Sequence, residues 1–250
     1  KKYNKDTTTI WNNTVITPGT DFMEKLHKAI ITHLDQNKYN IKCVYSSYHI
    51  PGEGEHKILQ DIKTNNNQIY GIYGLDADLI FLALASNKKK IYLVREDTFF
   101  HNDKSNKKEY EDVTEVLNYV SIDETRSCIN DHIITSLNMN TNNDFTDDFI
   151  ILCYFLGNDF IPNVPSIEIK NDGIDFLLDQ YVATYSKLKT GFINKSNNEV
   201  SINMNFFAMY INNLAKYEDY YFKVKFPNYF DRIFKRQCQS QDPYEVEIWN

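Results

Sequence analysis

The chain has 250 residues, of which 42% are hydrophobic and 24% are charged. This length and composition suit one large α/β domain or two small ones with a buried core. The formal net charge of −7 excludes a protein that holds nucleic acid by a general basic surface, and it leaves room only for a local basic groove.

Apolar runs, cysteines and chain ends restrict the class of protein further. The longest apolar runs, residues 79–85 and 149–156, are shorter than the roughly 20 residues of a membrane-spanning helix, and no signal-peptide pattern opens the chain. We therefore expect an intracellular protein, cytoplasmic or nuclear, with no membrane partner. The four cysteines are scattered, which favours reduced thiols over a disulfide framework or zinc site. Because the chain starts without methionine and stops at Asn250, we expect it to be a piece of a longer protein.

The first half of the chain alternates between strand and helix patterns. Residues 21–31 follow a turn and carry apolar residues every three to four positions, which predicts an amphipathic helix. Strands are predicted at residues 41–46, 68–74 and 90–95, with helices at 56–63 and 79–85 between them. This alternation indicates βαβ units around a mainly parallel sheet.

The second half of the chain reads as mostly helical. Residues 101–112 are predicted to form a solvated loop, and glycine and two prolines predict a turn-rich break at residues 157–165. Residues 191–203 are predicted to form a hairpin with 195–198 as its loop. Helices are expected at residues 113–117, 128–137, 147–156, 173–185 and 205–234, the last being aromatic-rich and packed on the main body.

Five acidic residues lie beside the most apolar segments. Glu53 and Glu55, in PGEGEHK, follow one predicted strand and open a helix, and Asp76 and Asp78, in LDADL, do the same after the next strand. Because open α/β sheets bind ligands at the carboxyl ends of their strands, we expect both pairs at the same edge of the sheet. Asp159 lies in GNDF, a turn whose flanking residues we expect to be buried.

A single acid at a helix N-terminus is usually a cap that complements the helix dipole. Capping needs one acid per helix, however, and clustered carboxylates repel each other unless a cation compensates them. Oxygen ligands without histidine or cysteine favour Mg²⁺ or Mn²⁺ over zinc. The chemistry that this pattern indicates is phosphoryl transfer to water with paired metal ions.

The Asp-x-Asp pattern also occurs in aspartyl phosphatases and glycosyltransferases. The phosphatase interpretation needs a threonine two positions after the second aspartate, where Ile80 stands. A sugar-nucleotide transferase would leave Glu53 and Glu55 unexplained. Both alternatives are therefore disfavoured.

The order and spacing of these motifs resemble the Xrn family of 5′→3′ exoribonucleases, within the larger group of flap-endonuclease-like nucleases. The resemblance covers roughly residues 15–215. The matching blocks are ITPGTDFMEKL (16–26), PGEGEHKI (51–58), YGLDADLIFLAL (73–84), LVRED (93–97), GNDFIPNVPSIEI (157–169) and GFINKSNNEVSIN (191–203).

The resemblance implies five of the seven acids of a two-metal site. Asp76, Asp78 and Asp159 would hold one Mg²⁺ or Mn²⁺ ion, Glu55 would hold the other with upstream acids, and Glu53 would be an outer or water-mediated ligand. The implied reaction is phosphodiester hydrolysis that releases mononucleotides from single-stranded RNA with a 5′-monophosphate. The family's first two aspartates and its 5′-phosphate pocket lie upstream of residue 1, so this fragment alone is expected to be weak or inactive.

The expected architecture is an α/β, PIN/flap-nuclease-like fold with a mainly parallel central sheet flanked by helices and a helical C-terminal part. We expect residues 1–170 to form the nuclease core, without its first strands, and residues 171–250 a helical extension with the hairpin. Two rival functions stay open: a structure-specific DNA or RNA endonuclease of the same superfamily, and a non-catalytic RNA-binding or scaffold protein. The sequence identifies no protein partner.

Other residues are interpreted more conservatively. We expect His56 and Lys57 to lie on a solvated first turn, and Arg95 is the best candidate for a phosphate contact. Aromatic residues between Tyr210 and Phe234 would be able to stack on bases, but helical spacing favours core packing for them.

Overall fold

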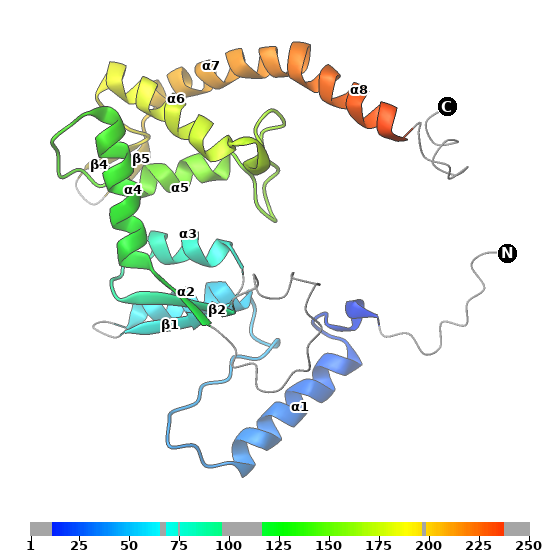
Figure 1. Ribbon diagram of the computed structural model, residues 1–250. Coiled ribbons are helices and arrows are strands. Elements are labelled where there is room, and N and C mark those ends of the chain that lie inside the picture. Colours follow the sequence, from blue (N-terminus) through cyan, green and yellow to red (C-terminus); the bar gives the residue numbers. More distant parts are fainter. Residues whose placement is uncertain (1–11, 66–68, 75, 97–116, 197–198, 238–250) are drawn as a thin grey trace, which may run out of the picture. The chain divides into compact units, whose positions relative to one another are not determined.

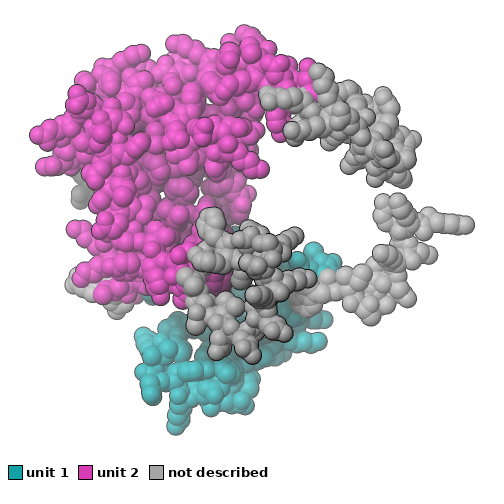
Figure 2. All heavy atoms as spheres, viewed as in Figure 1, with its two compact units in different colours: residues 1–64 teal, residues 65–250 magenta. Residues whose placement is uncertain are grey.

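The computed structural model describes residues 12–65, 69–74, 76–96, 117–196 and 199–237 (Figure 1). The chain divides into two compact units, Lys1–Thr64 and Asn65–Asn250 (Figure 2). The loop expected at residues 101–112 lies outside the described residues. Among the helices that are described, none combines the length and apolarity needed to cross a membrane.

The first unit contains a short 3₁₀ turn, Asn13–Val15, and two helices, α1 (Asp21–Gln36) and α2 (Gly54–Thr64). Helix α1 begins where the Thr20 hydroxyl accepts the backbone N–H of Met23 at 3.3 Å, which satisfies one of the free donors of the first turn. Both predicted helices of this unit are confirmed. Helix α1 extends five residues beyond the predicted end at residue 31.

The strand predicted at residues 41–46 is wrong. This segment has no regular secondary structure, and the side chains of Ile41 and Val44 are 72% and 81% exposed. The chain after it is tied to α1 instead, because the Tyr48 hydroxyl donates to Glu24 at 2.5 Å and His49 lies 3.2 Å from the same carboxylate. The hydrogen bond from Tyr48 lowers the pKa of Glu24 to about 2. An alternating pattern supplies β propensity, but a strand also needs a paired neighbour.

The second unit begins with a three-stranded sheet in the order β1-β2-β3. Strand β1 (Tyr70–Tyr73) pairs in parallel with β2 (Ile91–Glu96), and helix α3 (Asp78–Ala85) connects them. Strand β3 (Leu117–Ser121) pairs antiparallel with β2. The two predicted strands in this region are therefore confirmed, and the connection between them is the expected βαβ unit.

The helix expected at residues 113–117 is wrong at its last position. Leu117 begins β3, where it pairs with Glu96 of β2, whereas residues 113–116 lie outside the described part of the chain. The antiparallel ladder with β2 fixes this residue as strand, and the Ser121 hydroxyl then caps the next helix by accepting the N–H of Glu124.

The rest of the second unit is helical, apart from one hairpin. Its elements confirm the helices expected at residues 128–137, 147–156, 173–185 and 205–234 and the hairpin at 191–203, of which residues 197–198 lie outside the described residues. They are α4 (Ile122–Leu137), α5 (Thr146–Tyr154), the 3₁₀ turn η3 (Ile169–Asn171), α6 (Gly173–Leu188), β4 (Ile193–Ser196), β5 (Glu199–Ile202), α7 (Met204–Tyr220), a π-helical segment η4 (Tyr221–Lys225) and α8 (Phe226–Gln237).

Among the described residues, a hydrophobic core joins α4, α5, α6, the start of the hairpin and α7. Tyr181, Phe192, Phe206 and Tyr210 are completely buried there. Helix α7 packs along α6 as expected (Figure 1), but the later part of the aromatic-rich stretch does not join this core, because Phe222, Phe226 and Phe230 are 41–46% exposed. The predicted fold class, α/β with a helical C-terminal part, is confirmed.

Candidate active site

Glu53 and Glu55 lie at the start of α2, in the first unit. The carbonyl of Glu53 accepts the N–H of Lys57 at 3.1 Å, so Glu53 directly precedes the helix, and Glu55 is in its first turn. The Glu53 side chain is 57% exposed and lies 3.7 Å from His56, which is half exposed as expected. Lys57 is less exposed and donates to the backbone carbonyl of Ser47. The sequence therefore placed this pair correctly at a helix start, although no strand precedes it among the described residues of this unit.

Asp76 and Asp78 lie in the second unit, between β1 and α3. The Oδ1 atom of Asp76 accepts the backbone N–H of Asp78 at 3.2 Å, and Asp78 is the first residue of α3. Asp76 therefore fixes the local turn through one of its carboxylate oxygens. The helix that follows is anchored by Leu79, Ala83 and Leu84, all buried. The predicted position of this pair, after a strand and at the opening of a helix, is confirmed.

Asp159 lies in the turn that follows α5. The side-chain oxygen of Asn158 accepts the N–H groups of Phe160 and Ile161 at 2.9 and 2.8 Å, and the backbone N–H of Asn158 donates to the carbonyl of Ile161 at 2.8 Å. This closed turn leaves Asp159 exposed. The expectation that the flanking residues are buried is wrong, because Phe160 and Ile161 are 66% and 47% exposed. The Asn158 hydrogen bonds determine the turn, so no apolar anchor is needed.

The conformation of Gly157 sets the geometry of this turn. Its φ is +76°, and a Cβ atom there would lie 2.5 Å from the backbone nitrogen of Asn163 and 2.9 Å from the carbonyl oxygen of Ile161. Both the positive φ and the close backbone approach favour glycine at this position. The four-residue motif GNDF thus combines a required glycine, a turn-forming asparagine and an exposed carboxylate.

We expect Gly157→Ala to lower the free energy of unfolding by about 2–4 kcal/mol, because it combines left-handed strain with a backbone clash. Urea unfolding measures the change. Gly54→Ala is the matched control, since a Cβ atom at Gly54 meets nothing within 4 Å. Equal stability of the Gly157→Ala variant and the unmodified protein would contradict this account of the turn.

The five candidate acids are divided between the two compact units. Asp76 and Asp78 share a hydrogen bond, whereas Glu53 and Glu55 belong to the other compact unit. Across the described residues, no three His, Cys, Asp or Glu side chains are grouped so that they would hold a metal ion. The donor chemistry of the five acids nevertheless fits a hard cation, because all five are carboxylates. Their assembly into one site stays a prediction.

One acid that the sequence analysis did not single out has an internal role. Asp148 of α5 is buried and accepts a hydrogen bond from the Tyr181 hydroxyl. Burial raises the pKa of Asp148. Neighbouring Asp147 instead forms an ion pair with Lys195 at 2.7 Å. In the sequence, the only sign of this role is the pair of adjacent aspartates in the first turn of an apolar helix. The sequence does not show which of the two is buried, because that depends on contacts with α6 and the hairpin.

Comparison with known protein families gives two matches in chain order. Residues 1–97 match the family described as XRN 5′-3′ exonuclease N-terminus, and residues 139–244 match the one described as Xrn1 helical domain. The chain belongs to the Xrn family. Within the matched regions lie all five acids: Glu53, Glu55, Asp76 and Asp78 in the first, and Asp159 in the second. The domain division expected at residue 170 stays a prediction.

Several curated proteins are similar to this chain, among them three from different organisms that carry the name 5′-3′ exoribonuclease 2. The protein of Yarrowia lipolytica is 34% identical over 68% of this chain and 18% of its own length. The Saccharomyces cerevisiae protein is 33% identical over 72% of this chain and 21% of its own length. The Arabidopsis thaliana protein is 30% identical over 86% of this chain and 25% of its own length. The chain thus spans about a fifth to a quarter of the length of these relatives.

Proposed function

We propose that the protein containing this chain is a 5′→3′ exoribonuclease that degrades 5′-monophosphorylated single-stranded RNA to mononucleotides. The observation that carries the proposal is the pair of Xrn family matches, in order, with all five candidate acids inside them. The relatives' shared name, 5′-3′ exoribonuclease 2, supports RNA as the substrate. The proposed location is intracellular.

Two Mg²⁺ or Mn²⁺ ions are part of this proposal. Asp76, Asp78 and Asp159 would hold one ion, and Glu55 would contribute to the other, with Glu53 in an outer position. When bound, such ions stabilise charge on the attacking and departing oxygens of a phosphodiester.

The chain's own contribution is to present carboxylates from fixed positions. Asp76 bonds the start of α3, and Asn158 closes the turn that carries Asp159, so neither carboxylate is on a free loop. Fixed positioning of ligands reduces the entropy that the reaction would otherwise have to overcome. Arg95, half-buried on β2, is the proposed phosphate contact in this chain.

The proposal is tested with 3′-labelled single-stranded RNA and the full-length protein in Mg²⁺. We expect the RNA with a 5′-monophosphate to disappear without labelled intermediates, while its 5′-hydroxyl twin survives. Excess EDTA should stop the reaction and added Mg²⁺ or Mn²⁺ should restore it, because oxygen ligands of this kind select hard cations.

Two results would contradict the proposal. Labelled fragments from internal cuts, formed equally from both RNAs, would identify an endonuclease. Survival of both RNAs while the protein still binds them in a gel-shift assay would identify a binding or scaffold protein.

A further inference from the structure

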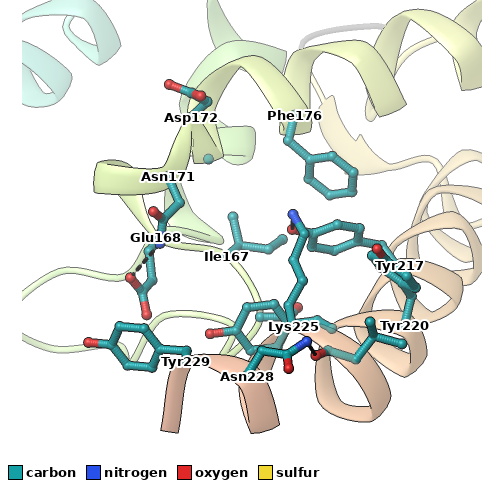
Figure 3. Close-up of a pocket in the computed structure, with 14 residues that line it drawn as sticks. Ile167, Glu168, Asn171, Asp172, Phe176, Tyr217, Tyr220, Lys225, Asn228 and Tyr229 are labelled. Carbon is teal, nitrogen blue, oxygen red and sulfur yellow. Dashed lines mark hydrogen bonds between the residues drawn. The ribbon is translucent and has the colours of Figure 1, made fainter. Parts of the chain in front are cut away.

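A cavity of about 480 Å³ opens in the second unit, where the start of α6 faces the end of α7, the π-helical segment and the start of α8 (Figure 3). The aromatic-rich segment was expected to be core, and Tyr210 is. Four later tyrosines, however, line this cavity: Tyr217, Tyr220, Tyr221 and Tyr229. None of the five candidate acids lines it. The volume is in the range of small-molecule sites.

One wall of the cavity is aromatic and is held in place by its own contacts. The rings of Phe176 and Tyr217 have centroids 4.2 Å apart, so the wall joins α6 to α7. Lys225 lies 5.2 Å above the Tyr217 ring and donates to the Tyr217 hydroxyl at 3.2 Å. A π-helical segment, Tyr221–Lys225, contributes side chains to this wall. Such segments are rare and are often found at functional sites.

The opposite wall is polar. Glu168 and Asn171 lie there, and the Asn171 amide donates to the Glu168 carboxylate at 2.9 Å, which orients it (Figure 3). A carboxylate on one side and the Lys225 ammonium on the other give the cavity an acceptor end and a cationic end. A ligand that fills it therefore needs an N–H donor edge, a flat face and an anionic group.

Ser166 gives independent support for a ligand. It lines the cavity, is only 4% exposed, and its hydroxyl has no hydrogen-bond partner among the described residues. A buried hydroxyl that is left unbonded costs free energy, so each such group in a folded protein requires an explanation. Rotation of this side chain toward the cavity would let the polar edge of a bound ligand supply the missing bond.

We propose that this cavity binds one nucleotide of a single-stranded RNA, with the base stacked on the tyrosines. Every nucleobase has a flat face, most carry an N–H donor on their edge, and tyrosine stacking is a common mode of single-strand recognition. The donor edge would face Glu168 and Ser166, and the phosphate would face Lys225. An aliphatic ligand would leave those polar groups unbonded. This site goes beyond the proposed function, because it requires binding and no hydrolysis.

The first test is calorimetric titration of the full-length protein, in EDTA to prevent hydrolysis, with guanosine 5′-monophosphate. Ribose 5-phosphate, which lacks the base, is the ligand control. We expect saturable binding of the nucleotide. The sugar phosphate should bind at least tenfold more weakly, because it lacks the base and so loses the binding free energy of one stacked base. Absence of saturable nucleotide binding at millimolar concentrations would overturn the proposal.

Two variants locate the binding. Ser166→Ala should weaken nucleotide binding about fivefold without lowering thermal stability, since its hydroxyl has no partner among the described residues of the free protein. The matched control is Ser86→Ala, a buried serine whose hydroxyl donates to Ala83 and accepts from Lys88, which should lose stability and keep its affinity.

Tyr229→Ala should weaken nucleotide binding about tenfold or more, because it removes a stacking surface. Tyr154→Ala, which removes a half-exposed tyrosine of α5 outside the cavity, is its control. If guanosine 5′-monophosphate binds but both Ser166→Ala and Tyr229→Ala retain full affinity, the nucleotide occupies another site and the proposal is overturned. RNA degradation by these variants is a separate readout, so failure of this site and failure of the proposed function are distinguishable.

Discussion

Asp78→Asn is expected to abolish RNA degradation by the full-length protein while the fold persists. As a proposed metal ligand, Asp78 would contribute several kcal/mol to transition-state stabilisation, and each ~1.4 kcal/mol corresponds to a factor of ten, so we expect a rate loss of about three orders of magnitude. The change preserves shape and removes one negative charge at the first residue of α3. Initial rates on 5′-monophosphorylated RNA measure the effect.

The stability of the Asp78→Asn variant separates a catalytic role from a structural one. Loss of the helix-dipole interaction destabilises α3, whereas relief of repulsion with Asp76 opposes that loss, so the net change should stay within about 1 kcal/mol.

Asp175→Asn is the matched control, because Asp175 is an exposed acid in the first turn of α6 and bears a similar relation to its helix. We expect that variant to keep full activity. A fall in stability of Asp78→Asn much larger than that of Asp175→Asn, with activity retained, would mean that Asp78 is structural.

Gly191→Ala is expected to lower the free energy of unfolding by about 3–5 kcal/mol. A Cβ atom at Gly191 would overlap the Asp148 carboxylate, 2.9 Å from its Cγ atom and 3.0 Å from the Tyr181 hydroxyl oxygen. A side-chain end that meets a new methyl group often moves away cheaply. Asp148 has no such freedom, since it is buried and held by the hydrogen bond from the Tyr181 hydroxyl.

Displacing this carboxylate would leave a buried acid with poor hydrogen bonds, which is why the expected cost is large. Denaturant unfolding of Gly191→Ala measures it. Gly71→Ala is the control, since a Cβ atom at Gly71 has no neighbour within 4 Å.

A double-mutant cycle tests the mechanism directly. If the clash with Asp148 is the cause, Gly191→Ala combined with Asp148→Ala should be no less stable than Asp148→Ala alone. Additive losses would show that Gly191 matters for another reason, such as the entry of the chain into β4.

Local signals were enough to predict most helices and the places of the acids along the chain. The turn that ends at Thr20 precedes a predicted helix, and a helix is formed by contacts between residues close in sequence, whereas the Ser121 cap was overlooked and α4 begins six residues before its predicted start. The same holds for the Asp76–Asp78 and Gly157–Asp159 turns, where glycine, asparagine and aspartate act on their own backbone. The order and spacing of these short motifs were also sufficient to predict the family.

Strand pairing and burial required the tertiary structure. Residues 41–46 alternate as a strand should, yet they form none, whereas Leu117 becomes a strand because β2 is beside it. Phe160 and Ile161 are apolar but exposed, since hydrogen bonds of Asn158 already fix their turn. A ladder bond or a buried surface depends on a partner distant in sequence, and one segment's pattern does not identify that partner.

The sequence by itself therefore determined most helices, the places of the five carboxylates along the chain and the family. Only the tertiary structure decided that Asp148 is an internal hydrogen-bond acceptor, that Gly191 must leave room for it, and that tyrosines of α7, the π-helical segment and α8 line a cavity with the unbonded Ser166. The physical reason is the range of the interactions. Capping and turn formation act over a few residues, whereas cavities and buried networks arise where helices far apart in sequence pack together.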